Sequence, residues 1–214
     1  MTAMQWPKMA RDLVAIVRGV TPDEVEQIAG ALIETGIQAI EVPLNSPDPL
    51  SSIRILAKTF GNETLIGGGT MLTVSDVEKV HAVGGRLFVS PNMRTQVVAR
   101  AAELGMVAMP GVMTPTEAWD AIDAGASGLK FFPADILGPS GIASIKVILP
   151  KASVIAAVGG ISADNLEAYM KAGVRALGIG STFYRPGDDA ATVRAKALPI
   201  IAAYDEARVR LLRG

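Results

Sequence analysis

The sequence contains no cysteine and one histidine among its 214 residues. Without cysteine there is neither a disulfide framework nor a thiolate metal site, and nothing indicates the redox compartment. No spaced cluster of histidine, aspartate and glutamate indicates a metal site, and no Gly-x-Ser-x-Gly motif indicates a serine hydrolase. The chemistry of this chain must be sought in other side chains.

The sequence also has little excess charge and no long apolar run. Its 20 basic and 21 acidic side chains give a formal net charge of -1, and no basic run indicates a nucleic-acid or anionic-membrane surface. No segment reaches the roughly 18 apolar residues of a membrane span, and the N-terminal segment lacks the apolar region and cleavage site of a signal peptide. We expect a cytoplasmic protein that acts on a small molecule, with no nucleic-acid or membrane partner.

What the chain does contain is a series of short apolar runs, which start roughly 20 to 26 residues apart, about the length of one strand and one helix. Helix-start patterns lie between them at residues 21–24, 114–117 and 162–165. Glycines that can end helices stand at four positions, Gly36, Gly105, Gly125 and Gly173. The runs cover residues 13–19, 39–44, 65–70, 87–91, 107–112, 128–133, 153–160 and 176–181.

These eight units predict the fold class. Continuous apolar runs are typical of strands buried on both faces of a parallel sheet. We expect an α/β protein with a (β/α)₈ TIM barrel, forming a single domain over residues 1–214. An open doubly wound sheet is the alternative. The last helix, from about residue 188 to 213, is long enough to cover the outside of the barrel.

Polar and small residues at the ends of the runs are the candidate site residues, because barrel enzymes place their sites at the carboxyl ends of the strands. Side chains alternate along a strand, and alternate strands share layers, so charges on the second and sixth strands can face the interior at one level. The run ends supply Arg18, Glu41, Thr70, Pro91, Lys130, Gly159, Gly160, Gly180 and Ser181.

Lys130 lies among apolar residues in the stretch GLKFFPA. One interpretation is a buried structural ion pair with Glu41, or a lysine that extends to the barrel mouth. The other is an amine nucleophile, because burial disfavours the ammonium form; lowering the pKa from about 10.4 to near 7 takes roughly 4 to 5 kcal/mol. A neutral lysine can attack a ketone to form a Schiff base, and Glu41 can then move protons.

Two glycine-containing pairs follow the seventh and eighth runs, Gly159 with Gly160 and Gly180 with Ser181. Loops at these positions of a TIM barrel commonly bind phosphate through backbone N–H groups and a helix N-terminus. The stretch GGGT at residues 67–70 has neither a P-loop ending nor Gly-x-Gly-x-x-Gly spacing, so we interpret Thr70 as a hydroxyl donor to a carboxylate. Arg18 can bind a carboxylate through its guanidinium or can be a surface charge. We expect His81 within the helix after the third strand, away from the site.

The ordered motifs IVRGVTPDE, IEVPLNSP, IGGGT, SPNM, PGVMTPTEA, LKFFPA, AVGGIS and GIGSTFYRPG span almost the whole chain. They resemble the class I aldolases of the KDPG/KDPGal family, which cleave 2-keto-3-deoxy-6-phosphosugar acids to pyruvate and glyceraldehyde 3-phosphate. The resemblance implies a homotrimer that acts in sugar-acid catabolism without a metal or organic cofactor.

By position, the resemblance makes Lys130 the Schiff-base nucleophile and Glu41 the acid/base. The pyruvyl carboxylate is assigned to Arg18 and Thr70, and the packing beside the pyruvyl group to Pro91 and Phe132. The phosphate is assigned to the glycine-containing pairs, Gly159 with Gly160 and Gly180 with Ser181.

The resemblance also separates two branches of the family. Gluconate enzymes have a TLRT-like stretch after the glutamate and tend to have threonine before the glycine pair, whereas this chain has VPLNSP and Val158. Replacing a hydroxyl by a methyl removes a polar contact to one substrate hydroxyl and changes the preferred C4 configuration. These differences favour the galactonate branch, while residues 131–134 and 90–91 resemble the gluconate pattern and leave dual specificity open.

Two other functions remain as alternatives. A phosphosugar epimerase or isomerase would use acid/base groups without an imine, and a noncatalytic phosphosugar-binding barrel would keep the phosphate loops and turn nothing over. The single histidine and the buried lysine argue against the first, and the second gives no reason for both Lys130 and Glu41 at the barrel mouth.

Overall fold

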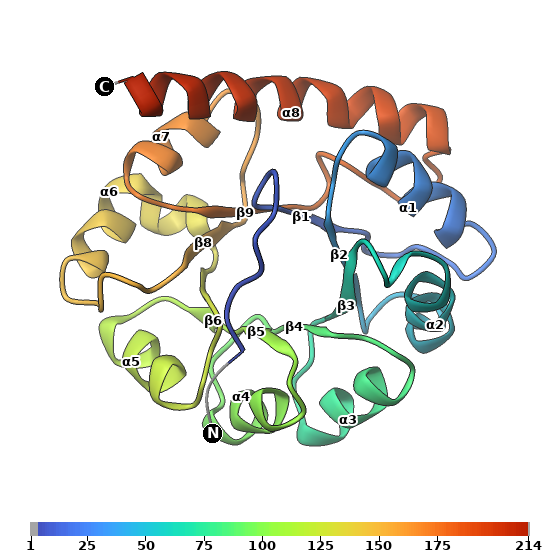
Figure 1. Cartoon of the computed structure of the whole chain (residues 1–214), viewed down its shortest axis with the longest axis horizontal. Helices are drawn as coiled ribbons and strands as arrows, with labels where there is room; N and C mark the ends of the chain where they lie inside the picture. The colour runs from blue at the N-terminus through green and yellow to red at the C-terminus, as the bar shows by residue number, and fades with distance from the viewer. Residues whose placement is uncertain (1–3, 214) are drawn as a thin grey trace.

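The computed structural model describes residues 4–213 and has the predicted TIM barrel. Figure 1 shows the helices arranged around the parallel strands. The strands are β1 (Leu13–Ile16), β2 (Ala39–Pro43), β3 (Leu65–Gly69), β4 (Leu87–Val89), β5 (Val107–Met109), β6 (Gly111–Val112), β7 (Leu129–Phe131), β8 (Ile155–Val158) and β9 (Ala176–Ile179). The helices are α1 (Val25–Glu34), α2 (Pro49–Phe60), α3 (Val74–Ala82), α4 (Thr95–Glu103), α5 (Pro115–Asp123), α6 (Ala134–Lys146), α7 (Leu166–Lys171) and α8 (Ala190–Arg213).

The fifth apolar run forms two strands, which accounts for nine strands in eight units. The sheet order is β5-β4-β3-β2-β1-β9-β8-β7-β6, so the two outermost strands are neighbours along the chain. They are separated only by Pro110, which has no N–H to donate to the sheet. The Pro110 carbonyl still accepts a hydrogen bond from the Lys130 N–H at 3.0 Å. The sheet therefore closes into a barrel through this segment, and the open-sheet alternative was wrong.

Two of the three expected helix starts need correction. At residues 114–117 the capping box is present as predicted, with Thr114 and Glu117 each bonding the other's backbone N–H. The other two helices, however, begin at Val25 and Leu166. In both cases the residues of the expected start form a turn that precedes the helix. Before α1 the Glu24 side chain accepts a hydrogen bond from the Thr21 N–H, and before α7 the Asn165 side chain accepts one from the Ser162 N–H.

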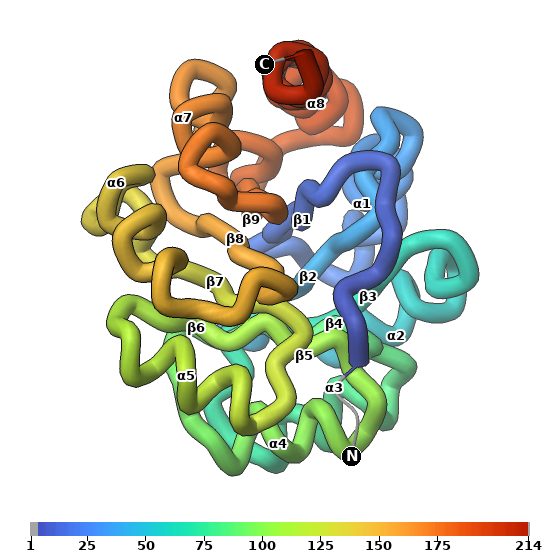
Figure 2. The backbone as a smooth tube through the Cα atoms, turned by 60° about the vertical axis from the view of Figure 1, so that its left-hand side comes forward, coloured from blue at the N-terminus to red at the C-terminus, as the bar shows by residue number. Residues whose placement is uncertain are grey.

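The strand side chains divide between two hydrophobic clusters. The larger one packs the outward strand residues against the helices, and the smaller one lies inside the barrel with Trp6 at its edge. The N-terminal segment that carries Trp6 crosses the barrel in both views (Figure 1 and Figure 2), and Trp6 Nε1 donates to Asp12 Oδ1 just before β1 at 2.7 Å. Trp6 thus lies beside Asp12 and Gly128, which directly precede β1 and β7, so it packs at the amino end of the barrel and leaves the carboxyl end for a site.

The last helix, α8, packs against α1 and α7 on the outside of the barrel, as expected (Figure 1). His81 lies in α3, also as expected. None of the helices within residues 4–213 combines the length and apolarity needed to cross a membrane.

Candidate active site

Lys130 is the central residue of β7 and points into the barrel. Its strand neighbours Leu129 and Phe131 belong to the outer cluster, so alternation turns Lys130 inward. The side chain is 5% exposed, and its Nζ lies 4.6 Å from the centre of the Phe132 ring. Burial lowers the Lys130 pKa to about 8; the Glu41 charge opposes this shift, and the Arg18 charge adds to it. The interior therefore makes the neutral amine far more populated than it is in a solvent-exposed lysine.

Glu41 points into the same interior from β2, since Ile40 and Val42 belong to the outer cluster. It is 2% exposed, and burial raises its pKa to about 7 against the opposing effects of Lys130 and Arg18. Its Oε2 has no hydrogen-bond partner among the described residues. A β-carbon at position 69 would overlap the carboxylate, so Gly69 provides the space that Glu41 occupies. A carboxyl that titrates near neutrality can both give and take a proton.

Arg18 follows β1 at the mouth of the barrel. Its Nη1 donates to Asn45 Oδ1, and the next residue, Gly19, donates its N–H to Ser46 Oγ at 2.9 Å. The loop after β2 thus holds both the guanidinium and the backbone beside it. Arg18 affects the pKa values of Lys130 and Glu41, so its charge reaches the buried pair.

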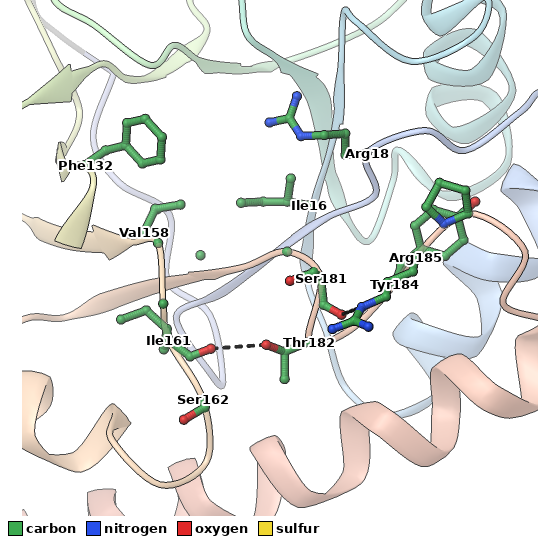
Figure 3. A pocket seen from close by; sticks show the side chains of 15 residues that line it. Ile16, Arg18, Phe132, Val158, Ile161, Ser162, Ser181, Thr182, Tyr184 and Arg185 are labelled. Atoms are coloured by element: carbon green, nitrogen blue, oxygen red, sulfur yellow. Dashed lines mark hydrogen bonds between the residues drawn. The ribbon is translucent and has the colours of Figure 1, made fainter. Parts of the chain in front are cut away.

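A pocket of about 450 Å³ opens at this end of the barrel (Figure 3). Seven of the predicted residues line it: Arg18, Phe132, Val158, Gly159, Gly160, Gly180 and Ser181. Sequence reasoning missed other lining residues, including Ile16, Ile161, Ser162, Thr182, Tyr184 and Arg185. Most of these residues could have been proposed because they stand next to the predicted glycine-containing pairs in the sequence. The sequence does not indicate, however, which of their side chains point into the pocket.

Four predicted residues are outside the pocket lining. Lys130 and Glu41 are buried beneath the mouth. Thr70 follows β3 directly after Gly69 and has φ of 56°, a left-handed conformation that is unusual for a β-branched residue and occurs mainly at functional sites. Pro91 follows β4, where Gly111 leaves space for its backbone. Both lie at the carboxyl end of the barrel without lining this pocket.

The loops after β8 and β9 carry unpaired backbone N–H groups on residues that line the pocket. Within residues 4–213 no intramolecular acceptor takes up the N–H groups of Gly160, Ile161 and Ser181. Gly160 has φ of 70°, and a β-carbon there would lie 2.8 Å from the Asp135 Cβ, so the turn requires glycine. Unpaired amides around a pocket can bind an anion such as a phosphate.

The arrangement combines an amine biased toward its neutral form, a carboxyl that can transfer protons, a guanidinium and an anion-binding loop pair. Such a site can form an imine with the ketone of an anionic substrate. In residues 4–213 no three His, Asp or Glu side chains come together to hold a metal ion.

Comparison with known proteins gives concordant results. The family model of KDPG and KHG aldolases matches residues 8–196. The chain is 55% identical to the probable 2-dehydro-3-deoxy-6-phosphogalactonate aldolase of Rhizobium meliloti (strain 1021), covering 93% of this chain and 94% of that protein. It is 40% identical to the 2-dehydro-3-deoxy-6-phosphogalactonate aldolase of Escherichia coli (strain K12), covering 95% and 99%. A solved structure described as native KDPGal superimposes with a TM-score of 0.93 at 40% identity, covering 95% and 98%.

Proposed function

The chain belongs to the KDPG and KHG aldolase family, and from this membership we propose the reaction and the residue roles that follow. The protein is a class I aldolase that reversibly cleaves 2-dehydro-3-deoxy-6-phosphogalactonate to pyruvate and D-glyceraldehyde 3-phosphate. The observation that carries the assignment of roles is the buried pair: both Lys130 and Glu41 are biased toward their neutral forms in one barrel interior, beneath a pocket with anion-binding loops.

In the first half of the reaction, neutral Lys130 Nζ attacks the C2 carbonyl carbon of the substrate. The resulting carbinolamine loses its hydroxyl as water, with Glu41 donating the proton directly or through water, and an iminium remains. The iminium withdraws electrons from the neighbouring C–C bond. Phe132, with its ring 4.6 Å from Nζ, lies beside the pyruvyl part of the intermediate.

In the second half, Glu41 takes the proton of the C4 hydroxyl, the C3–C4 bond breaks and its electron pair moves into the iminium. This step releases glyceraldehyde 3-phosphate and leaves an enamine. Protonation at C3 and hydrolysis of the imine then give pyruvate and regenerate the amine. The same carboxyl can serve both directions because it titrates near neutrality.

Substrate binding is divided between the two ends of the site. Arg18 and Thr70 bind the pyruvyl carboxylate, and Pro91 packs beside the pyruvyl group with Phe132. Gly159, Gly160, Gly180 and Ser181 bind the phosphate, which their place in the pocket and the unpaired N–H groups around them support.

Val158 is the residue we assign to the choice between C4 epimers. It lines the pocket directly before Gly159, and a methyl there offers no hydrogen bond to a substrate hydroxyl. The alternative is a 2-dehydro-3-deoxy-6-phosphogluconate aldolase or a dual-specificity enzyme. An epimerase or a noncatalytic binding barrel is more remote, because neither needs a nucleophilic amine.

The experiment is to measure pyruvate release from both C4 epimers by the wild type, Lys130→Met and Val158→Thr. We expect the wild type to have a higher kcat/KM for the galactonate epimer, and Lys130→Met to release no pyruvate from either epimer. In Val158→Thr the ratio of the two kcat/KM values should shift roughly tenfold toward the gluconate epimer, which is the size of one gained or lost polar contact. Pyruvate release by Lys130→Met at the wild-type rate would contradict the mechanism. Equal kcat/KM values for the two epimers in the wild type would make the enzyme dual-specific.

Residues 1–214 form one aldolase domain in this proposal, acting in the cytoplasm as a homotrimer. Association between copies is supported by large apolar side chains exposed on the neighbouring helices α5 and α6 and just beyond α6, namely Trp119, Ile136, Val147 and Ile148. Light scattering of the purified protein tests the trimer.

A further inference from the structure

Arg185 lies in the loop between β9 and α8 and lines the pocket beside Ser181. Its Nε donates to the Ser181 carbonyl at 3.3 Å, and its backbone N–H donates to Asp188 Oδ2 at 2.7 Å. No acceptor among residues 4–213 engages the two terminal Nη groups. The stem of the side chain is therefore held against its own loop, while the four N–H donors on the two Nη atoms remain available.

The nearby acid is already neutralised by another cation. Asp188 accepts from Lys196 Nζ at 2.5 Å, so its charge is shared with a lysine. Asp135, the acidic residue next to Gly160, is not among the residues that line the pocket. Within residues 4–213 the Arg185 side chain forms no ion pair, although its charge still interacts with that of Asp188, and the guanidinium lines the pocket as a positive charge.

The pocket contains a second cation at a separate place. Arg18 and Arg185 are the charged residues of the lining, and no acidic residue lines it. Figure 3 shows Arg18 on the side of Phe132 and Arg185 beside Ser181 and Thr182. Such a distribution fits a substrate with one anionic group at each end, because each guanidinium can bind one of them.

The two loops near Arg185 are also joined to each other. Thr182 Oγ1 donates to the Ile161 carbonyl at 3.3 Å, so the β9–α8 loop is bonded to the β8–α7 loop. The unpaired N–H groups of Gly160, Ile161 and Ser181 therefore lie on loops held together beside the Arg185 side chain.

We propose that Arg185 is a substrate-binding residue whose Nη groups donate hydrogen bonds to the substrate phosphate, adding a side-chain cation to the backbone donors of the two loops. The inference rests on the proposed function for the identity of the anion. It assigns to Arg185 a specific task, which is to distinguish phosphorylated from unphosphorylated aldehydes and keto acids.

The test compares Arg185→Gln and Arg185→Lys with Arg94→Gln. Arg94 is an exposed arginine that precedes α4 at the same end of the barrel, has no capping hydrogen bond from its side chain and lies outside the pocket. It controls for the loss of one positive charge. Three readouts are measured: the KM for the phosphorylated substrate, inhibition by inorganic phosphate, and the rate of pyruvate condensation with unphosphorylated glyceraldehyde.

In Arg185→Gln we expect KM for the phosphorylated substrate and Ki for inorganic phosphate to rise about 10- to 100-fold, with kcat and the glyceraldehyde rate close to wild type. Arg185→Lys should recover part of the loss, and Arg94→Gln should match the wild type. Unchanged KM and Ki in Arg185→Gln, or an equal loss with glyceraldehyde, would overturn the proposal.

Failure of the underlying function has a different signature. Wild type and Arg185→Gln should both form a pyruvyl adduct with pyruvate and borohydride, since Arg185 lies in the β9–α8 loop and is not among the groups that shift the Lys130 pKa. If the wild type forms no adduct, the aldolase assignment fails. Calorimetric titration of both proteins with inorganic phosphate still tests the role of Arg185. Weaker phosphate binding by the variant supports that role, and equal binding refutes it.

Discussion

Replacing Glu41 by glutamine should increase the fraction of Lys130 that is neutral and at the same time lower the turnover. The amide has nearly the same volume as the carboxyl, so the buried site keeps its packing. Burial lowers the pKa of Lys130 to about 8, while the Glu41 charge raises it. Removing that charge should therefore lower the lysine pKa further, by about one pH unit for a nearby opposite charge.

The magnitudes follow from the protonation equilibrium. At pH 7 a pKa of about 8 leaves about one lysine in ten neutral, compared with about one in three thousand at 10.5, a gain of about 300-fold in nucleophile. In Glu41→Gln the neutral fraction should rise to about one half. Turnover should nevertheless fall by about 10²- to 10⁴-fold, because the variant has no carboxyl to transfer protons.

The assay is a ¹³C NMR titration of protein labelled at the lysine Cε, in which the Lys130→Met spectrum identifies the signal of interest. Steady-state kinetics on the same samples give the turnover. Glu103→Gln serves as the control, since Glu103 is an exposed partner of Arg100 on the outer helix α4. A wild-type Lys130 that titrates near 10.4, or a Glu41→Gln variant in which it titrates higher than in the wild type, would refute the reasoning.

Further predictions concern stability, pH and the space around the carboxylate. Lys130→Met should raise the free energy of unfolding at pH 7 by up to about 3 kcal/mol, because the folded state no longer holds an ammonium whose pKa is lowered by burial. This gain should shrink between about pH 8 and 10.5. Urea denaturation that shows a loss of stability at pH 7 would contradict the prediction. The kcat/KM for cleavage should fall on the acid side of about pH 8 as Lys130 becomes protonated in the free enzyme, and a flat profile from about pH 5 to 9 would argue against a titrating amine. Gly69→Ala should displace the Glu41 carboxylate and lower kcat by about 10²-fold or more. The control is Gly30→Ala in α1, where there is room for a methyl group and kcat should not change. Equal kcat values for the two variants would show that the carboxylate does not depend on the space at position 69.

Much of the barrel could be predicted from the sequence because its strands are buried on both faces. Continuous apolar runs are sufficient to locate such strands, and the alternation along β7 and β2 then turns Lys130 and Glu41 inward. The apolar runs do not, however, predict which backbone groups form hydrogen bonds. The division of the fifth run at Pro110 and the helix starts at Val25 and Leu166 depend on which N–H groups find acceptors, and a hydrophobic pattern does not carry that information.

The pocket was only partly predictable for a related reason. Glycine-containing pairs mark the loops after β8 and β9, but the direction of side chains such as Arg185 and Thr182 depends on hydrogen bonds that join the loops. The sequence also gave no sign that Asn45 accepts from Arg18, since the two residues are far apart in the chain and meet only when the barrel closes.

The central claim, that Lys130 forms a covalent imine, is tested most directly by intact-mass analysis after incubation with pyruvate and borohydride. The wild type should gain the mass of one reduced pyruvyl group, peptide mapping should place it on Lys130, and folded Lys130→Met should gain none. A folded wild-type protein without an adduct, or an adduct retained by Lys130→Met, would contradict the account.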